Sequence, residues 1–91
     1  MATVIVTLKI MPESPSINLE ILKTKSCKVI ESMAGKVEQT SFEPVAFGLK
    51  SLKIVYAVDE SSGDTEALEN KLAEIDGVQS VSVAGVSRAL G

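Results

Sequence analysis

The sequence predicts an α+β sandwich in which two helices back a four-stranded antiparallel sheet. Two segments carry apolar residues at the three- and four-residue spacing of a helix, and four segments show the alternation of a strand with one buried face. These segments follow one another in the order β-α-β-β-α-β, which is typical of the ferredoxin-like fold. With 91 residues in the chain, we expect a single domain, residues 1–91.

The first strand and the first helix have clear boundaries. Thr3–Met11 alternates apolar and polar residues, and prolines at positions 12 and 15 then break the chain. A helix follows, with Ser16 or Asn18 as its N-cap and Gly35 as its end. The strand's expected buried face holds Val4, Val6, Leu8 and Ile10, and the helix's apolar stripe holds Leu19, Leu22, Val29, Ile30 and Met33.

The second half of the chain repeats the pattern with a weaker first strand. Lys36–Glu43 is mostly polar, which suits an edge strand, and simple alternation places Val37 and Phe42 on opposite faces. The next strand is the clearest, with Leu52, Ile54, Tyr56 and Val58 on its buried side.

A second helix and a last strand complete the chain. Asp64 or Thr65 is the expected helix cap, and Gly77 is the expected left-handed residue that closes the helix. Val78–Val83 then reads as a strand. The helix's buried stripe holds Leu68, Leu72 and Ile75, and the strand's core side holds Val81 and Val83.

Between the second and third strands, the chain makes a turn with an apolar tip. Pro44 has no backbone N–H and Gly48 can adopt a positive φ, so a tight reversal is expected between them. The residues enclosed are Val45, Ala46 and Phe47, although hairpin connections are normally polar. Phe47 either packs back over the core or is exposed and contacts a binding partner. The hydrophobic periodicity does not distinguish between these interpretations.

Composition restricts the partners and the compartment. Twelve acidic and nine basic residues give a net charge of −3, which disfavours nonspecific binding to nucleic-acid phosphates. No apolar run approaches the ~20 residues that cross a bilayer, and the start of the chain has no signal-peptide pattern. The single cysteine, Cys27, fits a reducing compartment. We therefore expect a cytoplasmic protein without nucleic-acid or membrane partners.

The residue types favour a binding module over an enzyme. Because the chain has no histidine and one cysteine, serine–histidine and cysteine–histidine pairs and imidazole metal sites are excluded. There is no glycine-rich phosphate loop, and the open face of the third strand offers no aromatic ring for base stacking. We expect no catalytic residue, no bound metal and no cofactor.

Two separated segments resemble one known family. Pro44-Val-Ala-Phe-Gly-Leu-Lys50 is similar to the Pro-Val-Gly-(Phe/Tyr)-Gly-Ile-Lys segment of the guanine-nucleotide exchange domain of translation elongation factor 1-beta. Val78-Gln-Ser-Val-Ser-Val-Ala-Gly-Val-Ser-Arg88 is similar to that family's closing Val-Gln-Ser-x-x-Val-Ala-Ala-x-x-Lys. The resemblance covers the whole chain, and the short form looks like the archaeal version.

The resemblance implies a guanine-nucleotide exchange factor for the GTPase elongation factor 1-alpha. In the family, the exchange domain binds the GDP-bound GTPase and speeds release of GDP, so that GTP can load. A lysine near the family's C-terminus enters the GTPase's magnesium and phosphate site, and Arg88 holds that position here. The resemblance therefore gives the exchange role to Arg88, in a protein that is monomeric when free. It gives partner binding to Val45, Ala46, Phe47, Gly48, Lys50, Val86 and Ser87.

Two positions depart from the family pattern. Ala46 stands where the family has glycine, and Arg88 stands where it has lysine. A guanidinium is planar and forks toward phosphate, whereas an ammonium is a compact point charge. We expect Arg88 to perturb the Mg²⁺ ligands and the phosphate together, rather than to take the place of the ion.

A second function class is open at this point. The polar edge strand Lys36–Glu43 also suits a small-molecule-sensing or regulatory ferredoxin-like module that oligomerises through its sheet edges. That alternative predicts a stable dimer with a ligand-dependent thermal shift, whereas the exchange factor predicts a monomer that binds a GTPase.

Overall fold

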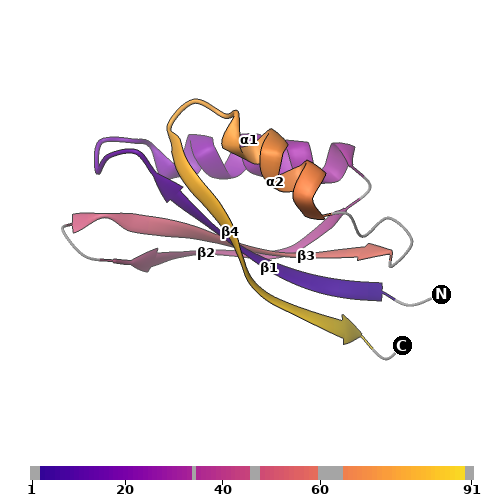
Figure 1. The fold of residues 1–91 in the computed structure, drawn as a ribbon. Coiled ribbons are helices and arrows are strands. Elements are labelled where there is room, and N and C mark those ends of the chain that lie inside the picture. Colours follow the sequence, from indigo (N-terminus) through magenta and orange to yellow (C-terminus); the bar gives the residue numbers. More distant parts are fainter. Residues whose placement is uncertain (1–2, 34, 46–47, 60–64, 90–91) are drawn as a thin grey trace.

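The elements follow the predicted β-α-β-β-α-β order in a computed structural model that describes residues 3–33, 35–45, 48–59 and 65–89 (Figure 1). All strand pairs in this part of the chain are antiparallel. The predicted α+β ferredoxin-like fold is therefore confirmed. The elements are β1 (Thr3–Pro12), α1 (Leu19–Ser32), β2 (Lys36–Pro44), β3 (Lys50–Asp59), α2 (Thr65–Ala73) and β4 (Val78–Ala89).

The sheet has the strand order β2-β3-β1-β4, so β3 and β1 are central and β2 and β4 are edges. The edge position predicted for the second strand is confirmed. Both helices lie on the same face of the sheet, with α1 over the β2 side and α2 over the β4 side (Figure 1). The opposite face carries no element of the described part of the chain.

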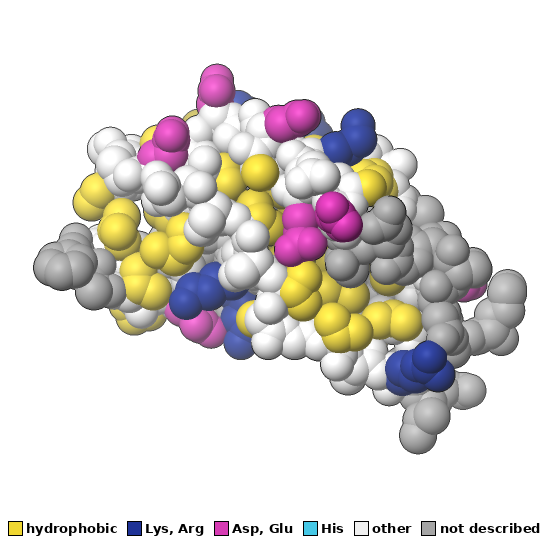
Figure 2. Space-filling view, in the orientation of Figure 1, with side chains coloured by type: hydrophobic (Ala, Val, Ile, Leu, Met, Phe, Trp, Pro, Cys, Tyr) yellow, Lys and Arg dark blue, Asp and Glu magenta, His cyan; other side chains and the backbone are white. Residues whose placement is uncertain are grey.

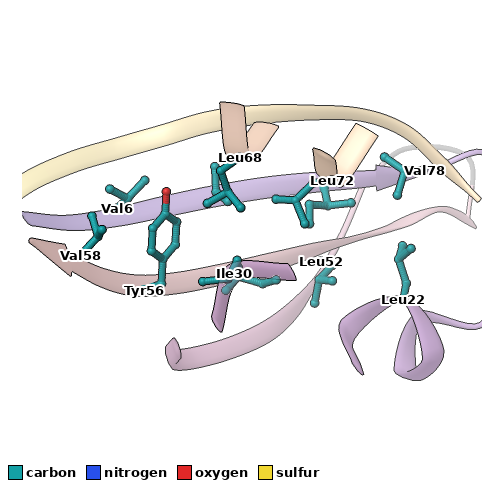
Figure 3. Close-up of a cluster of buried hydrophobic side chains, with 12 residues drawn as sticks. Val6, Leu22, Ile30, Leu52, Tyr56, Val58, Leu68, Leu72 and Val78 are labelled. Atoms are coloured by element: carbon teal, nitrogen blue, oxygen red, sulfur yellow. The ribbon is translucent and has the colours of Figure 1, made fainter. Parts of the chain in front are cut away.

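The core lies between this sheet and the two helices, and it is filled by apolar residues that the alternation in the sequence predicted to be buried. Apolar side chains of the two central strands point toward the helices, where rows from α1 and α2 meet them (Figure 3). Burial of this apolar surface stabilises the fold. The buried core residues are Val6, Leu8, Ile10, Leu22, Ile30, Leu52, Ile54, Tyr56, Val58, Leu68, Leu72 and Val78.

The faces predicted for β2 were wrong. Val37 pairs with Tyr56 and Gln39 with Val55, so Glu38 is an extra residue without a cross-strand partner in the register. Residues directly opposite in an antiparallel pair share a face. The extra residue therefore brings Phe42, which is opposite Leu52, onto the same helix-covered face as Val37.

Phe42 is 38% exposed and lies under α1 at the sheet edge. The Nζ of Lys23 on α1 is 5.9 Å from the centroid of the Phe42 ring, at the outer limit of a cation–π contact. This second phenylalanine is thus accounted for by packing beside the helix.

The first helix is capped by Asn18. Its Oδ1 accepts hydrogen bonds from the backbone N–H groups of Glu20 (2.9 Å) and Ile21 (3.3 Å). The other predicted cap, Ser16, instead shares a 2.8 Å hydrogen bond with Ser14. Helix α1 ends before the predicted Gly35, whose N–H donates to the carbonyl of Ile30 at 3.0 Å.

The predicted stripe of α1 omits Ser26, which is fully buried one turn from Leu22 and from Ile30. In the described part of the chain, its Oγ has no hydrogen-bond partner. Because a buried, unpaired hydroxyl is costly and alanine is the better helix former, Ser26→Ala should stabilise the fold by about 1 kcal/mol. Urea unfolding of both forms measures this difference. A less stable alanine variant would show that the hydroxyl is hydrogen-bonded.

The end of α2 differs from the prediction. The helix stops at Ala73, and the backbone N–H of Ile75 donates to the carbonyl of Leu72 at 3.1 Å in a tighter turn. Gly77 has the predicted left-handed φ, +94°, but it follows this turn rather than closing the helix directly. The position before Thr65, where Asp64 was the other expected cap, lies outside the described residues.

Tyr56 is the one aromatic core residue in the described segments. Burial raises the pKa of its phenol above the ordinary value near 10, and the Glu69 carboxylate on α2 adds to the rise. Since the unfolded phenol ionises first, its contribution to stability is complete below about pH 10 and is lost as the pH rises further.

The expected result is a urea midpoint that falls between about pH 8 and about pH 11, and that falls less in Tyr56→Phe. The phenylalanine variant is the control because it lacks only the phenol hydroxyl and shares every other titratable group with the parent protein. Equal falls in the two proteins would contradict the role of the phenol.

Candidate functional site

The hairpin between β2 and β3 forms the tight reversal that the sequence predicted. Pro44 and Lys50 are the last paired residues of the two strands, and the N–H of Val45 donates to the carbonyl of Leu49 at 2.8 Å. Gly48 has a φ of +75°, in the left-handed region that favours glycine. Of the site residues predicted here, Gly48 and Lys50 are exposed and Val45 is half-buried. The other two, Ala46 and Phe47, lie outside the described residues.

The last strand is longer than predicted, and its second half holds the other site residues. Val78–Val83 was expected, but β4 continues to Ala89 and pairs with β1 as far as Thr3. The prediction ended where the alternation of apolar residues is interrupted, near Gly85. The strand continues because β1 offers backbone partners on that side, and backbone pairing does not depend on the side-chain pattern.

A register shift in β4 sets the face on which Arg88 lies. Leu8 pairs with Val83 and Thr7 with Gly85, which leaves Ala84 as an extra residue. Beyond this shift Arg88 is opposite Val4, whose side chain packs against the core. Arg88 therefore lies on the helix-covered face of the sheet, at its outer edge.

The three β4 residues predicted for the site are divided between the two faces. Val86 is opposite buried Val6, on the same face as Arg88, and yet it is 61% exposed. Ser87 is opposite Ile5, on the other face. An exposed valine next to an exposed arginine makes a mixed apolar and cationic surface on the helix side of this edge.

The two groups of predicted site residues lie at opposite ends of the sheet (Figure 1). Val4 pairs with Arg88 on one side and with Val58 on the other, and β3 runs from Val58 back to Lys50 in the hairpin. At about 3.3 Å per residue, the two ends are roughly 26 Å apart along β3. The longest dimension of the molecule is 41 Å. One partner that contacts both ends must therefore span most of the length of this domain.

A hollow beside the hairpin adds residues that the sequence analysis did not single out. It is lined by Pro12, Ser14, Pro15, Ile17, Leu19, Gly48 and Lys50, and its volume is about 210 Å³. The connection from β1 to α1 follows neither a helical nor a strand period, so the pattern gave no reason to place it next to the hairpin. Its prolines marked it only as a break.

The remaining chemistry of the described residues is limited. Burial raises the pKa of the Cys27 thiol, and the neighbouring Glu31 carboxylate adds to the rise, so the thiol is protonated at neutral pH. Among the residues described, no three metal-ligating side chains gather. None of the described helices has the length and apolar character needed to cross a membrane.

Comparison with protein families decides the identification. Residues 5–89, which include both ends of the sheet, match the sequence model of the EF-1 guanine nucleotide exchange domain. The chain belongs to this family. The family resemblance found in the sequence is thereby confirmed, and membership of an EF-1 exchange domain supports a nucleotide-exchange role in translation elongation.

Relatives of this exchange domain are similar over nearly the whole chain. Elongation factor 1-beta of Methanocaldococcus jannaschii is 46% identical over 89 residues, which cover 98% of this chain and 100% of the relative. Elongation factor 1-beta of Methanosphaera stadtmanae is 42% identical over 90 residues, covering 99% and 100%. That of Staphylothermus marinus is 40% identical over 89 residues, covering 97% and 98%. These archaeal relatives agree with the archaeal form predicted from the sequence.

Solved structures that resemble the exchange domain show the fold alone. The ACT domain from the GTP pyrophosphokinase of Chlorobium tepidum has a TM-score of 0.61 at 16% identity, covering 87% of this chain and 95% of that one. The C-terminal domain of the MgtC protein from Mycobacterium tuberculosis has a TM-score of 0.59 at 12% identity, covering 98% and 88%. Since ferredoxin-like sheets host many unrelated functions, similarity to these two structures does not indicate a function for this chain.

Proposed function

We propose that this chain binds the GDP-bound form of the GTPase elongation factor 1-alpha and promotes release of GDP, so that GTP can bind. The observation that carries the proposal is the family match over residues 5–89. The placement of Arg88 on a paired strand supports it, because a cation presented from a strand reaches a partner with little loss of conformational freedom. The protein acts in the cytoplasm and is monomeric when free.

Arg88 acts on the nucleotide site of the partner. Mg²⁺ requires near-octahedral coordination and bridges phosphate oxygens in GTPases. A guanidinium placed beside it repels the ion and forks toward the phosphate, so the Mg²⁺ geometry is lost and affinity for GDP falls. By linkage, nucleotide binding weakens the complex with the exchange factor by the same factor, and the cycle turns over. No bond is broken in this chain, which is therefore a binding protein rather than an enzyme.

The hairpin end binds a separate surface of the same GTPase. Val45, Gly48 and Lys50, together with the tip residues Ala46 and Phe47, supply this contact, and Val86 and Ser87 flank the arginine at the other end. Binding at both ends, roughly 26 Å apart, fixes the orientation of the domain along the partner. That orientation directs Arg88 toward the nucleotide.

Release of fluorescent GDP from archaeal elongation factor 1-alpha tests the proposal. The chain at catalytic concentration is expected to accelerate release in the presence of excess unlabelled nucleotide. No acceleration at any concentration would overturn the exchange function. Sedimentation of the free chain then examines the alternative, because a regulatory module that oligomerises by its sheet edges would sediment as a dimer.

A further inference from the structure

The hollow beside the hairpin has walls that are fixed before any partner arrives. Glu13 donates its backbone N–H to the carbonyl of Gly77 at 2.8 Å, and Ile17 donates to the carbonyl of Ser14 at 3.2 Å. These bonds hold the connection from β1 to α1, while the bond from Val45 to Leu49 closes the hairpin on the other side. A preformed hollow binds without the cost of ordering its own walls.

The lining of the hollow combines apolar side chains with polar groups in about equal share. Two prolines, Ile17 and Leu19 give apolar walls, and Ser14 adds a hydroxyl. Among the described residues that line the hollow, Lys50 is the one that carries a charge. At about 210 Å³ the hollow is below the roughly 300–1,000 Å³ of ordinary small-molecule pockets. Its size fits a single side chain, and its chemistry fits an apolar group with a carboxylate beside it.

The described ends of this chain do not reach the hollow. Thr3 and Ala89 pair with each other at the far end of the sheet. By contrast, Gly48 and Lys50 belong both to the hollow and to the predicted partner-binding hairpin. Figure 2 shows hydrophobic side chains gathered at this end of the molecule, with basic and acidic side chains beside them. The hollow therefore continues the hairpin surface.

We propose that this hollow receives an apolar side chain, flanked by a carboxylate, from the GTPase partner. The inference rests on the proposed exchange function and adds a second kind of contact to it. The hairpin end then contacts the partner both through the predicted binding residues Val45, Gly48 and Lys50 and through the hollow beside them. The other contacts of the hairpin end still orient the domain when this contact is lost, so its loss is expected to weaken affinity and to leave the rate within the saturated complex unchanged.

Two serines provide a matched pair of variants. Ser14 lines the hollow and Ser16 does not, and the two share one hydrogen bond. Ser14→Leu and Ser16→Leu both remove that bond, but only Ser14→Leu fills the hollow. We expect Ser14→Leu to raise the concentration of chain that half-saturates GDP release by about tenfold, the loss of one buried apolar contact. The rate at saturation should not change, and Ser16→Leu should match the parent.

A charge-reversal pair tests the carboxylate. Lys50→Glu and Lys28→Glu change the net charge equally, but Lys28 is an exposed residue of α1 away from the hollow. Of these two variants, we expect only Lys50→Glu to raise the concentration of chain that half-saturates GDP release. This effect should become smaller as the salt concentration is raised. Thermal unfolding of all four variants shows that they fold.

The outcomes separate this inference from the proposed function. A parent protein that accelerates release, with Ser14→Leu and Lys50→Glu equal to their controls, would overturn the hollow as a binding site and leave the exchange function intact. A parent protein that fails to accelerate release would overturn both. A fall in the saturated rate of Ser14→Leu, at unchanged half-saturation, would also contradict a contact that serves affinity.

Discussion

Replacing Arg88 with alanine is expected to slow GDP release at a saturating concentration of the chain by about 10- to 100-fold. Loss of one charge-assisted hydrogen bond and its charge costs roughly 1.5–3 kcal/mol, and each 1.4 kcal/mol is a factor of about ten. The half-saturating concentration should change less, because the hairpin end still binds. Stopped-flow release of fluorescent GDP at several concentrations of the chain separates the two quantities.

Two further variants show whether the face of the strand matters. Arg88→Lys keeps the cation and should retain most of the activity. In Arg88→Ala/Ser87→Arg the guanidinium moves by one residue to the opposite face of the sheet, since Ser87 is opposite Ile5. We expect no recovery in this double variant. Because Arg88 also has a partner within the chain, unfolding of each variant is measured alongside, and full activity of Arg88→Ala would reject its assigned role.

Truncation of Leu8 is expected to have the largest effect on stability. This side chain is fully buried on a central strand, with Ile54 opposite on β3 and Val83 opposite on β4. Leu8→Ala removes buried apolar surface and leaves a cavity, which costs about 2–5 kcal/mol. For a domain whose whole stability is roughly 5–15 kcal/mol, that loss is a large share. Urea unfolding gives the difference in free energy.

The neighbouring position is the control for this truncation. Lys9 lies on the opposite face, across from Lys53 and Ser82, and is half-buried. Lys9→Ala is therefore expected to change the free energy of unfolding by no more than about 0.5–1 kcal/mol. Similar losses of unfolding free energy in Leu8→Ala and Lys9→Ala would contradict a core on the Leu8 face of β1.

The fold could be predicted because each central element carries its own periodicity. Leu52, Ile54 and Tyr56 alternate without interruption, and burial of that face against two amphipathic helices leaves few arrangements. The register shifts could not be predicted in this way. Nothing in the sequence marks Glu38 or Ala84 as a bulge residue. Each is left without a cross-strand partner in the register because the residues on either side of it pair with consecutive residues of the neighbouring strand.

The candidate site depended on resemblance more than on pattern. Elimination led to a binding module and left Phe47 and Arg88, the only arginine, as candidates. Because the predicted last strand stopped at Val83, the pattern alone favoured an incidental charge in a chain tail for Arg88. The structure places Arg88 in a strand with a defined partner, Val4. The hollow near Ser14 was not predicted because its lining comes from two segments that are distant in the sequence. The pattern of either segment alone does not show that the two lie side by side.

The pairing of Val4 with Arg88 has a consequence for synthesis of the protein. Of the described elements, β1 leaves the ribosome first and β4 last, so the arginine finds its backbone partner only when nearly all of the domain has emerged. Contacts between such distant residues form late and slowly. A nascent or truncated product that lacks β4 also lacks Arg88, so on the proposed function it is expected not to accelerate GDP release.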